Sequence, residues 1–106
     1  MMNGGMMYSK GDIVLIQFPF SDLINAKRRP MVVLAVKGED VVGCAITSNP
    51  ESDGVPIPDG TLPLQSKIKH WQIHTFVDSL VLKKVGKLPV KTHKELIQII
   101  NMFFSI

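Results

Sequence analysis

The sequence is poor in cysteine, because its 106 residues include only Cys44. A single thiol excludes an intrachain disulfide framework and is typical of a reducing compartment. Its position inside an apolar run indicates a small buried side chain. No apolar run approaches the roughly 20 residues that cross a bilayer, and Met1 to Met7 lack the features of a signal peptide. We therefore expect a cytoplasmic protein without a membrane partner, with residues 1–8 as a flexible tail.

The sequence also lacks the common signatures of metal and cofactor sites. His70, His74 and His93 stand apart from one another and from the cysteine, so a zinc site is not expected. There is no Gly-rich phosphate loop. Ser48 and Ser66 lack the flanking glycines of a nucleophile elbow. We predict no metal and no cofactor.

What is present indicates one globular domain over residues 9–106. Hydrophobic residues make up 45% of the chain and charged residues 20%, which is ordinary for such a domain. The net charge is +3 and the pI is about 9.2. This mild excess of positive charge permits a polyanionic partner but does not require one.

The most informative stretch predicts a β-hairpin. The apolar runs Met31 to Val36 and Val41 to Ile46 flank the polar turn Lys37 to Asp40. A hairpin brings the residue before its first strand close to the residue after its second, so Arg29 and Thr47 are expected to be neighbours. A guanidinium beside a hydroxyl at the open end of a hairpin is suited to holding a phosphate.

The other patterns predict short strands between Gly and Pro turns, over residues 12–18, 55–58, 66–76 and 87–90, with brief pairing over 62–64. Alternation along 66–76 places Ile68 and His70 on one side and Ile73 on the other. Strands this short and numerous predict a small closed or partly closed barrel. The fold class is therefore mainly β with helices.

Two helices are expected. The first covers residues 79–85 and ends at Gly86. The second is C-terminal and begins with the capping-box spacing of Thr92 and Glu95. Its apolar stripe consists of Leu96, Ile99, Ile100, Phe103 and Ile106. Two readings of this stripe stay open: the helix packs on its own barrel, or part of the stripe faces a second subunit.

A polar set on this apolar scaffold suggests RNA chemistry: Arg28, Arg29, Thr47, Ser48, Gln72, His74 and Thr75. Cleavage of RNA by its own 2′-hydroxyl needs deprotonation of that hydroxyl, charge relief on the phosphate, and a proton for the leaving oxygen. Arg suits the charge relief, and His suits a proton transfer. The alternative reading is that the arginines face solvent and the histidine is structural.

Several strings occur in an order and spacing that resemble the PemK/MazF-like toxins of bacterial type II toxin–antitoxin systems. The likeness covers roughly residues 9–104. It rests on Gly11-Asp12-Ile13-Val14, Arg28-Arg29-Pro30, Ala45-Ile46-Thr47-Ser48, Ser66-x-Ile68-Lys69, Gln72-Ile73-His74-Thr75 and Leu80 through Gly86-Lys87-Leu88. No single string is specific, but the ordered set is.

The resemblance implies a small SH3-like (CcdB/PemK-type) barrel with a short inserted helix and a C-terminal helix. It also implies a homodimer, a cognate antitoxin, and a metal-independent endoribonuclease acting on single-stranded RNA. The products would be a 2′,3′-cyclic phosphate or 3′-phosphate and a 5′-hydroxyl. The expected catalytic residues are Arg29, Thr47 and His74. The expected substrate-binding residues are Phe20, Lys27, Arg28, Ser48, Gln72 and Thr75.

The chain departs from the family pattern at His74, at Val77, and in the loop from Phe20 to Lys27, which has no glycine. His74 stands where many relatives have Arg, and Val77 stands where an acidic residue is common. These departures leave three hypotheses open: a ribonuclease of altered activity or specificity, a gyrase-binding toxin of the same architecture, and a degenerate relative that only binds RNA or antitoxin.

Overall fold

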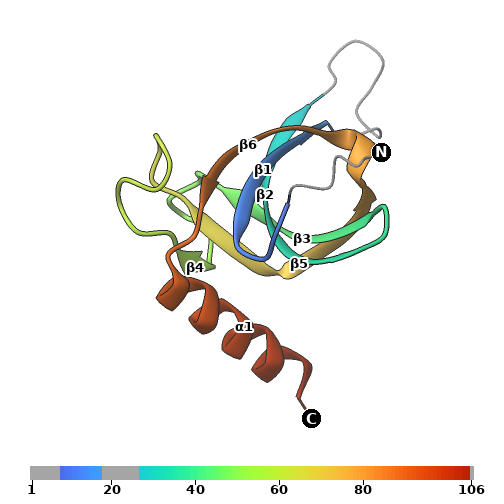
Figure 1. Ribbon diagram of the computed structural model, residues 1–106. Coiled ribbons are helices and arrows are strands. Elements are labelled where there is room, and N and C mark those ends of the chain that lie inside the picture. The colour runs from blue at the N-terminus through green and yellow to red at the C-terminus, as the bar shows by residue number, and fades with distance from the viewer. Residues whose placement is uncertain (1–7, 18–26, 106) are drawn as a thin grey trace.

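The computed structural model describes residues 8–17 and 27–105, which fold around one curved antiparallel sheet (Figure 1). The strand order is β4-β5-β3-β2-β1-β6. The strands are β1 Asp12–Gln17, β2 Arg28–Lys37, β3 Asp40–Thr47, β4 Val55–Pro56, β5 Lys67–Val77 and β6 Val81–Lys87. A 3₁₀ turn, η1 (Asp78–Leu80), precedes β6, and the helix α1 (Val90–Phe104) follows it.

The predicted mainly β fold with a C-terminal helix is confirmed. The sheet curls but is not closed, since β4 and β6 are its two edges within the described residues. This is the partly closed form of the expected barrel. No helix in residues 8–17 and 27–105 is long and apolar enough to cross a membrane.

The predicted hairpin is formed by β2 and β3. Lys37 pairs with Asp40 around a two-residue turn, and Gly38 there has a φ of +59°, which favours glycine. The ladder continues to Met31 opposite Ala45. The register shifts by one residue between Val33 and Ala35, so the ladder contains a bulge near its middle.

Both faces of the sheet carry apolar side chains. One face packs under α1, where Leu96 and Ile100 complete a cluster formed by Ile13, Val32, Cys44 and Ile68, among others. The other face holds a second cluster: Val14, Ile16, Met31, Val33, Val41 and Phe76. Each fully buried side chain of this kind stabilises the fold by about 1.5–3 kcal/mol relative to exposure. Leu96 and Ile100 are the buried part of the apolar stripe predicted for α1, whereas Phe103 is 53% exposed.

β5 contains a bulge that breaks the predicted alternation. Cys44 pairs with Ile73 and Ala45 with Lys69, so residues 70–72 have no partner on β3. Ile68 and Ile73 therefore contribute to the same core cluster, where strict alternation would separate them. The bulge also carries His70, whose ring meets Phe103 of α1 edge-on with 5.6 Å between ring centroids.

The helix predicted over residues 79–85 is wrong. Only Asp78–Leu80 is helical, as a 3₁₀ turn, and Val81–Lys87 is the edge strand β6. Pairing with β1 supplies backbone hydrogen bonds that a short isolated helix lacks, and two β-branched valines suit a strand.

Three other expectations are corrected. Residues 62–64 form bends and not a strand. Residues 87–90 do not form a separate strand: Lys87 ends β6, Leu88 is buried, and α1 begins at Val90. Thr92 is not the helix cap, because α1 begins at Val90 with Pro89 before it and no capping side chain. Pro89 starts the helix because its ring fixes a compatible φ and its missing N–H needs no partner there.

Asp12 is a charged side chain that the fold buries, with 1% of its surface exposed. The Ser9 backbone N–H donates to its Oδ2 at 2.9 Å. Lys84 and Lys87 place their Nζ atoms 3.1 and 3.4 Å from Oδ1. Burial raises the pKa of Asp12, but these partners outweigh burial and hold the pKa below its ordinary value.

We predict that Asp12→Asn lowers the free energy of unfolding by about 1–3 kcal/mol, because a buried charge-assisted network is lost. Urea denaturation at pH 7 measures it. Asp59→Asn is the control, since Asp59 loses the same charge from an exposed turn. Equal stability of the two variants would contradict the structural role of Asp12.

His93 lies at the start of α1, and its buried Nε2 has no hydrogen-bond partner within the described part of the chain. Burial lowers the pKa of His93, and the nearby charges of Lys10 and Lys87 lower it further. The folded state therefore favours the neutral imidazole.

The pH dependence follows from that direction. The unfolded pKa is about 6.5, so the contribution of His93 is complete above this pH and is lost as pH falls toward the lower folded pKa. We expect urea denaturation between pH 7.5 and 5 to show a shallower decline for His93→Gln than for wild type. An unchanged slope in His93→Gln would refute the assignment.

Candidate functional site: a cleft at the mouth of the hairpin

A cleft of about 490 Å³ lies at the open end of the β2–β3 hairpin. One wall comes from the hairpin itself: Arg28, Arg29, Pro30, Ile46, Thr47 and Ser48. Continuing the register from the pair Met31 and Ala45 sets Arg29 opposite Thr47. Directly opposed residues of an antiparallel pair share a face of the sheet, so the two side chains predicted to be neighbours meet at one cleft.

The chemistry of this wall suits an anion. Arg28 and Arg29 are exposed, and a guanidinium offers a planar fork of donors to a phosphate. The Thr47 hydroxyl accepts a hydrogen bond from the Asn49 backbone N–H at 3.1 Å. This bond orients the oxygen and leaves its own proton for donation to a ligand.

The opposite wall was not predicted. It consists of Leu62, Pro63, Leu64, Ser66 and Val85. Ser66 is 7% exposed, and its hydroxyl donates to the Leu64 carbonyl at 2.9 Å, which fixes the turn. The string beginning at Ser66 is part of the family resemblance, but no local pattern indicates where residues 61–65 fold back.

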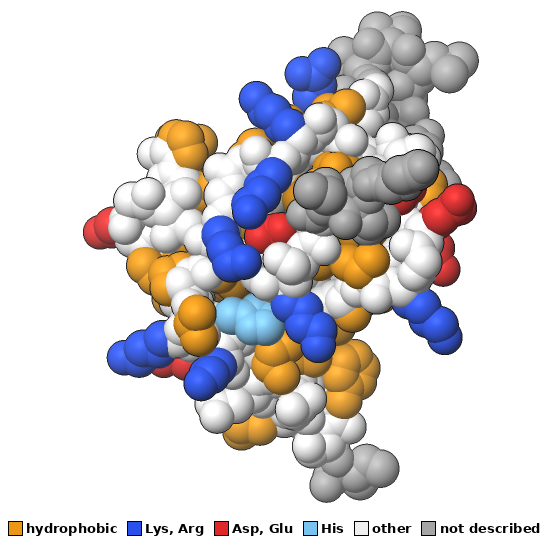
Figure 2. Space-filling view, viewed as in Figure 1, with side chains coloured by type: hydrophobic (Ala, Val, Ile, Leu, Met, Phe, Trp, Pro, Cys, Tyr) orange, Lys and Arg blue, Asp and Glu red, His pale blue; other side chains and the backbone are white. Residues whose placement is uncertain are grey.

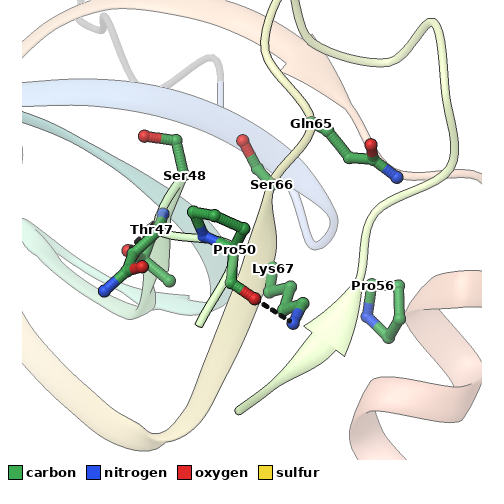
Figure 3. A pocket seen from close by; sticks show the side chains of 8 residues that line it. Thr47, Ser48, Pro50, Pro56, Gln65, Ser66 and Lys67 are labelled. Carbon is green, nitrogen blue, oxygen red and sulfur yellow. Dashed lines mark hydrogen bonds between the residues drawn. The ribbon is translucent and has the colours of Figure 1, made fainter. Parts of the chain in front are cut away.

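A second pocket of about 340 Å³ adjoins the cleft and shares Thr47, Ser48 and Ser66 with it (Figure 3). In Figure 3 the Ser48 and Ser66 hydroxyls point to the same side. Lys67 closes the neighbouring loop, because its Nζ donates to the carbonyls of Pro50 at 3.2 Å and Ser52 at 2.8 Å. This loop follows directly from the end of β3 and therefore holds Thr47 in place.

Not all predicted site residues are brought to the cleft. His74 is exposed and pairs with Gly43, four residues along β3 from Thr47, which is about 13 Å at about 3.3 Å per residue. Gln72 lies in the β5 bulge, and Thr75 pairs with Val42. None of the three lines the cleft.

Two predicted site residues remain, Lys27 and Phe20, which both precede β2 in the sequence. Lys27 immediately precedes Arg28 and is exposed, but it does not line the cleft. Phe20 lies outside the described residues.

A family model described as PemK-like, MazF-like toxin of type II toxin–antitoxin system matches residues 9–104. The chain belongs to this toxin family. A search among curated proteins found no match.

Solved structures share the fold of this toxin. MazF (form I) from Deinococcus radiodurans is 16% identical with a TM-score of 0.73, covering 93% of this chain and 97% of that chain. Mycobacterium tuberculosis toxin MazF-mt6 is 18% identical with a TM-score of 0.70, covering 88% and 95%. An endoribonuclease from a mycobacterial species, in complex with its cognate antitoxin, is 13% identical with a TM-score of 0.69, covering 88% and 90%. At these identities the likeness establishes the fold alone.

We predict that Lys67→Met loosens the loop beside Thr47. Two hydrogen bonds from a charged donor are lost, and the free energy of unfolding falls by about 1–3 kcal/mol. Hydrogen exchange at Ser52, whose N–H donates to the Asn49 carbonyl, should become faster. Lys69→Met on the same strand serves as the control, and equal exchange at Ser52 in both variants would refute the role of Lys67.

Proposed function

We propose that this toxin is a metal-independent endoribonuclease that cleaves single-stranded RNA with the 2′-hydroxyl of the RNA as nucleophile. The observation that carries the proposal is the meeting of Arg29 and Thr47 at one cleft in a member of the PemK/MazF-like family. One of the solved structures with this fold is itself described as an endoribonuclease.

The reaction divides into three tasks. The 2′-oxygen loses its proton and bonds to phosphorus, and the bond from phosphorus to the 5′-oxygen breaks. The products are a 2′,3′-cyclic phosphate and a 5′-hydroxyl, which takes up a proton. Arg29 would neutralise the charge that grows on the phosphate oxygens, and Thr47 would orient one of those oxygens. Arg28 and Ser48, which line the same cleft, would hold the adjoining backbone.

His74 is retained as the candidate for proton transfer, because an imidazole titrates near neutral pH. If it transfers a proton, His74→Gln should flatten the pH dependence of cleavage near neutrality. The other predicted contacts, from Phe20, Lys27, Gln72 and Thr75, stand as further RNA-binding candidates.

The partners in the proposal are a cognate antitoxin and a second copy of the chain. The matched family consists of toxins of two-component systems, and one of the solved structures is a complex with its antitoxin. For the second copy, the end of α1 carries a large exposed apolar surface, with Met102, Phe103 and Phe104 between 53% and 74% exposed. A surface of this kind fits the alternative in which part of the helix faces another subunit.

The decisive test is cleavage of a mixed RNA by purified protein in EDTA. We expect Arg29→Ala to lower the cleavage rate by about 100-fold or more, as loss of a preorganised charge-stabilising group does. Thr47→Val should reduce the rate in the same direction while keeping the side-chain shape. Lys37→Ala, at the other end of the hairpin, is the control for a lost surface charge and should cleave like wild type.

The outcomes separate the hypotheses. If Arg29→Ala cleaves as fast as wild type, the role of Arg29 is wrong. If wild-type protein leaves RNA intact but inhibits supercoiling by gyrase, the chain is a binding toxin. If it binds RNA with steep salt dependence and neither cleaves it nor inhibits gyrase, the chain is a degenerate relative.

A further inference from the structure

A second concentration of positive charge lies away from the hairpin. It runs along β6 onto the first turns of α1, and we call it the lysine track: Lys10, Lys83, Lys84, Lys87, Lys91 and Lys94, all exposed. Figure 2 shows Lys and Arg side chains in an oblique row over β6 that continues around the start of α1.

The track concentrates more charge than the whole chain carries. Segments 10–12 and 83–95 contain six lysines and two carboxylates, Asp12 and Glu95, which gives +4. The net charge of the chain is +3, so the remainder sums to −1. Asp12 is 1% exposed, so the lysines dominate the charge that a partner meets.

The track is held together by the fold. Lys84 and Lys87 both approach the same oxygen of Asp12, at 3.1 and 3.4 Å. Gly11 lies against the His93 ring and accepts a hydrogen bond from the Leu88 N–H at 2.9 Å. These contacts tie the segment with Lys10 to the end of β6 and to the start of α1, so Lys10, Lys84 and Lys87 are held near the first turn of the helix that carries Lys91 and Lys94.

The track also joins the cleft. Val85 of β6 lines the cleft. Ile16 of β1 pairs with Arg29 on one side and with Val81 of β6 on the other, so only one strand separates the two basic regions. β6 is seven residues long and begins at Val81. At about 3.3 Å per residue it extends roughly 20 Å from that point.

Protection of an open sheet edge explains part of this pattern. Lysines and bulges on an edge strand discourage pairing with other chains, and β6 has both. Edge protection does not account for Lys10, Lys91 or Lys94, because these lysines lie outside the strand. Segments 10–12 and 83–95 also contain no Phe, Tyr or Trp, so no base-stacking platform is present there.

We propose that the lysine track binds the sugar-phosphate backbone of single-stranded RNA where the strand runs on from the cleft. This inference rests on the proposed function, because it assigns the track to the same substrate. Lysines bind phosphates as point charges without reading base edges. The contact is therefore independent of base sequence, and it favours substrates longer than the cleft can hold.

The test measures binding of 2′-O-methyl RNA, which lacks the attacking hydroxyl, so binding and cleavage are read separately. The variant is Lys91→Gln/Lys94→Gln, which removes two lysines outside the edge strand and leaves both partners of Asp12 in place. The matched control is Lys37→Gln/Lys69→Gln, which removes two lysines outside the track.

For a 20-nucleotide RNA, the track variant should bind about 10-fold more weakly than the control. The slope of log affinity against log salt should be smaller by about 1.4, at about 0.7 per phosphate contact. Affinity for a four-nucleotide RNA should change less than about 2-fold, because that RNA fills only the cleft.

Other results would overturn the proposal. If variant and control bind the long RNA with equal affinity and equal salt slope, the lysine track does not bind RNA. An equal loss on both RNA lengths would place the effect at the cleft. Unchanged RNA binding with lost binding of poly-glutamate would assign the surface to an acidic polypeptide. If wild-type protein cuts no unmodified RNA but the length-dependent loss is found, the track stands and the nuclease proposal fails.

Discussion

The register of the β2–β3 hairpin is the constraint on which the rest of the structure depends. Pairing from Lys37 opposite Asp40 to Met31 opposite Ala45 is fixed at one end by a glycine turn and along its length by buried side chains. The ladder contains one register shift, between Val33 and Ala35. Because of this shift Arg29, and not Pro30, lies opposite Thr47 at the open end of the hairpin.

The hairpin alone makes only one wall. The other wall depends on contacts between segments far apart in sequence: the turn after β4, which Ser66 fixes, and Val85 on β6. β6 is in turn held against β1 by its ladder and by the two lysines around Asp12. The ion pairs on one part of the sheet thus help to position a wall of the cleft on another.

Local patterns predicted the parts of this molecule that local physics decides. The glycine turn, the β-branched runs and the spacing of Leu96 and Ile100 were sufficient for the hairpin and the C-terminal helix. The same reasoning failed for residues 81–87, where the edge of β1 supplies hydrogen bonds that no window of sequence displays. It failed at Thr92 because Pro89 already provides a helix start. The approach of Arg29 to Thr47 follows from the hairpin, but the bulge between Val33 and Ala35 sets which residue lies directly opposite Thr47. The distance of His74 depends on the register of β5, which another bulge alters.

That bulge has a consequence for how the strand tolerates changes in length. The pairs on either side of residues 70–72 are set independently, by Ile73 against Cys44 and by Lys69 against Ala45. In a regularly paired stretch of sheet, an inserted or deleted residue would invert every side chain beyond it. Here a change in the number of intervening residues is absorbed by chain that already has no partner on β3, so both ends of the strand keep their facing.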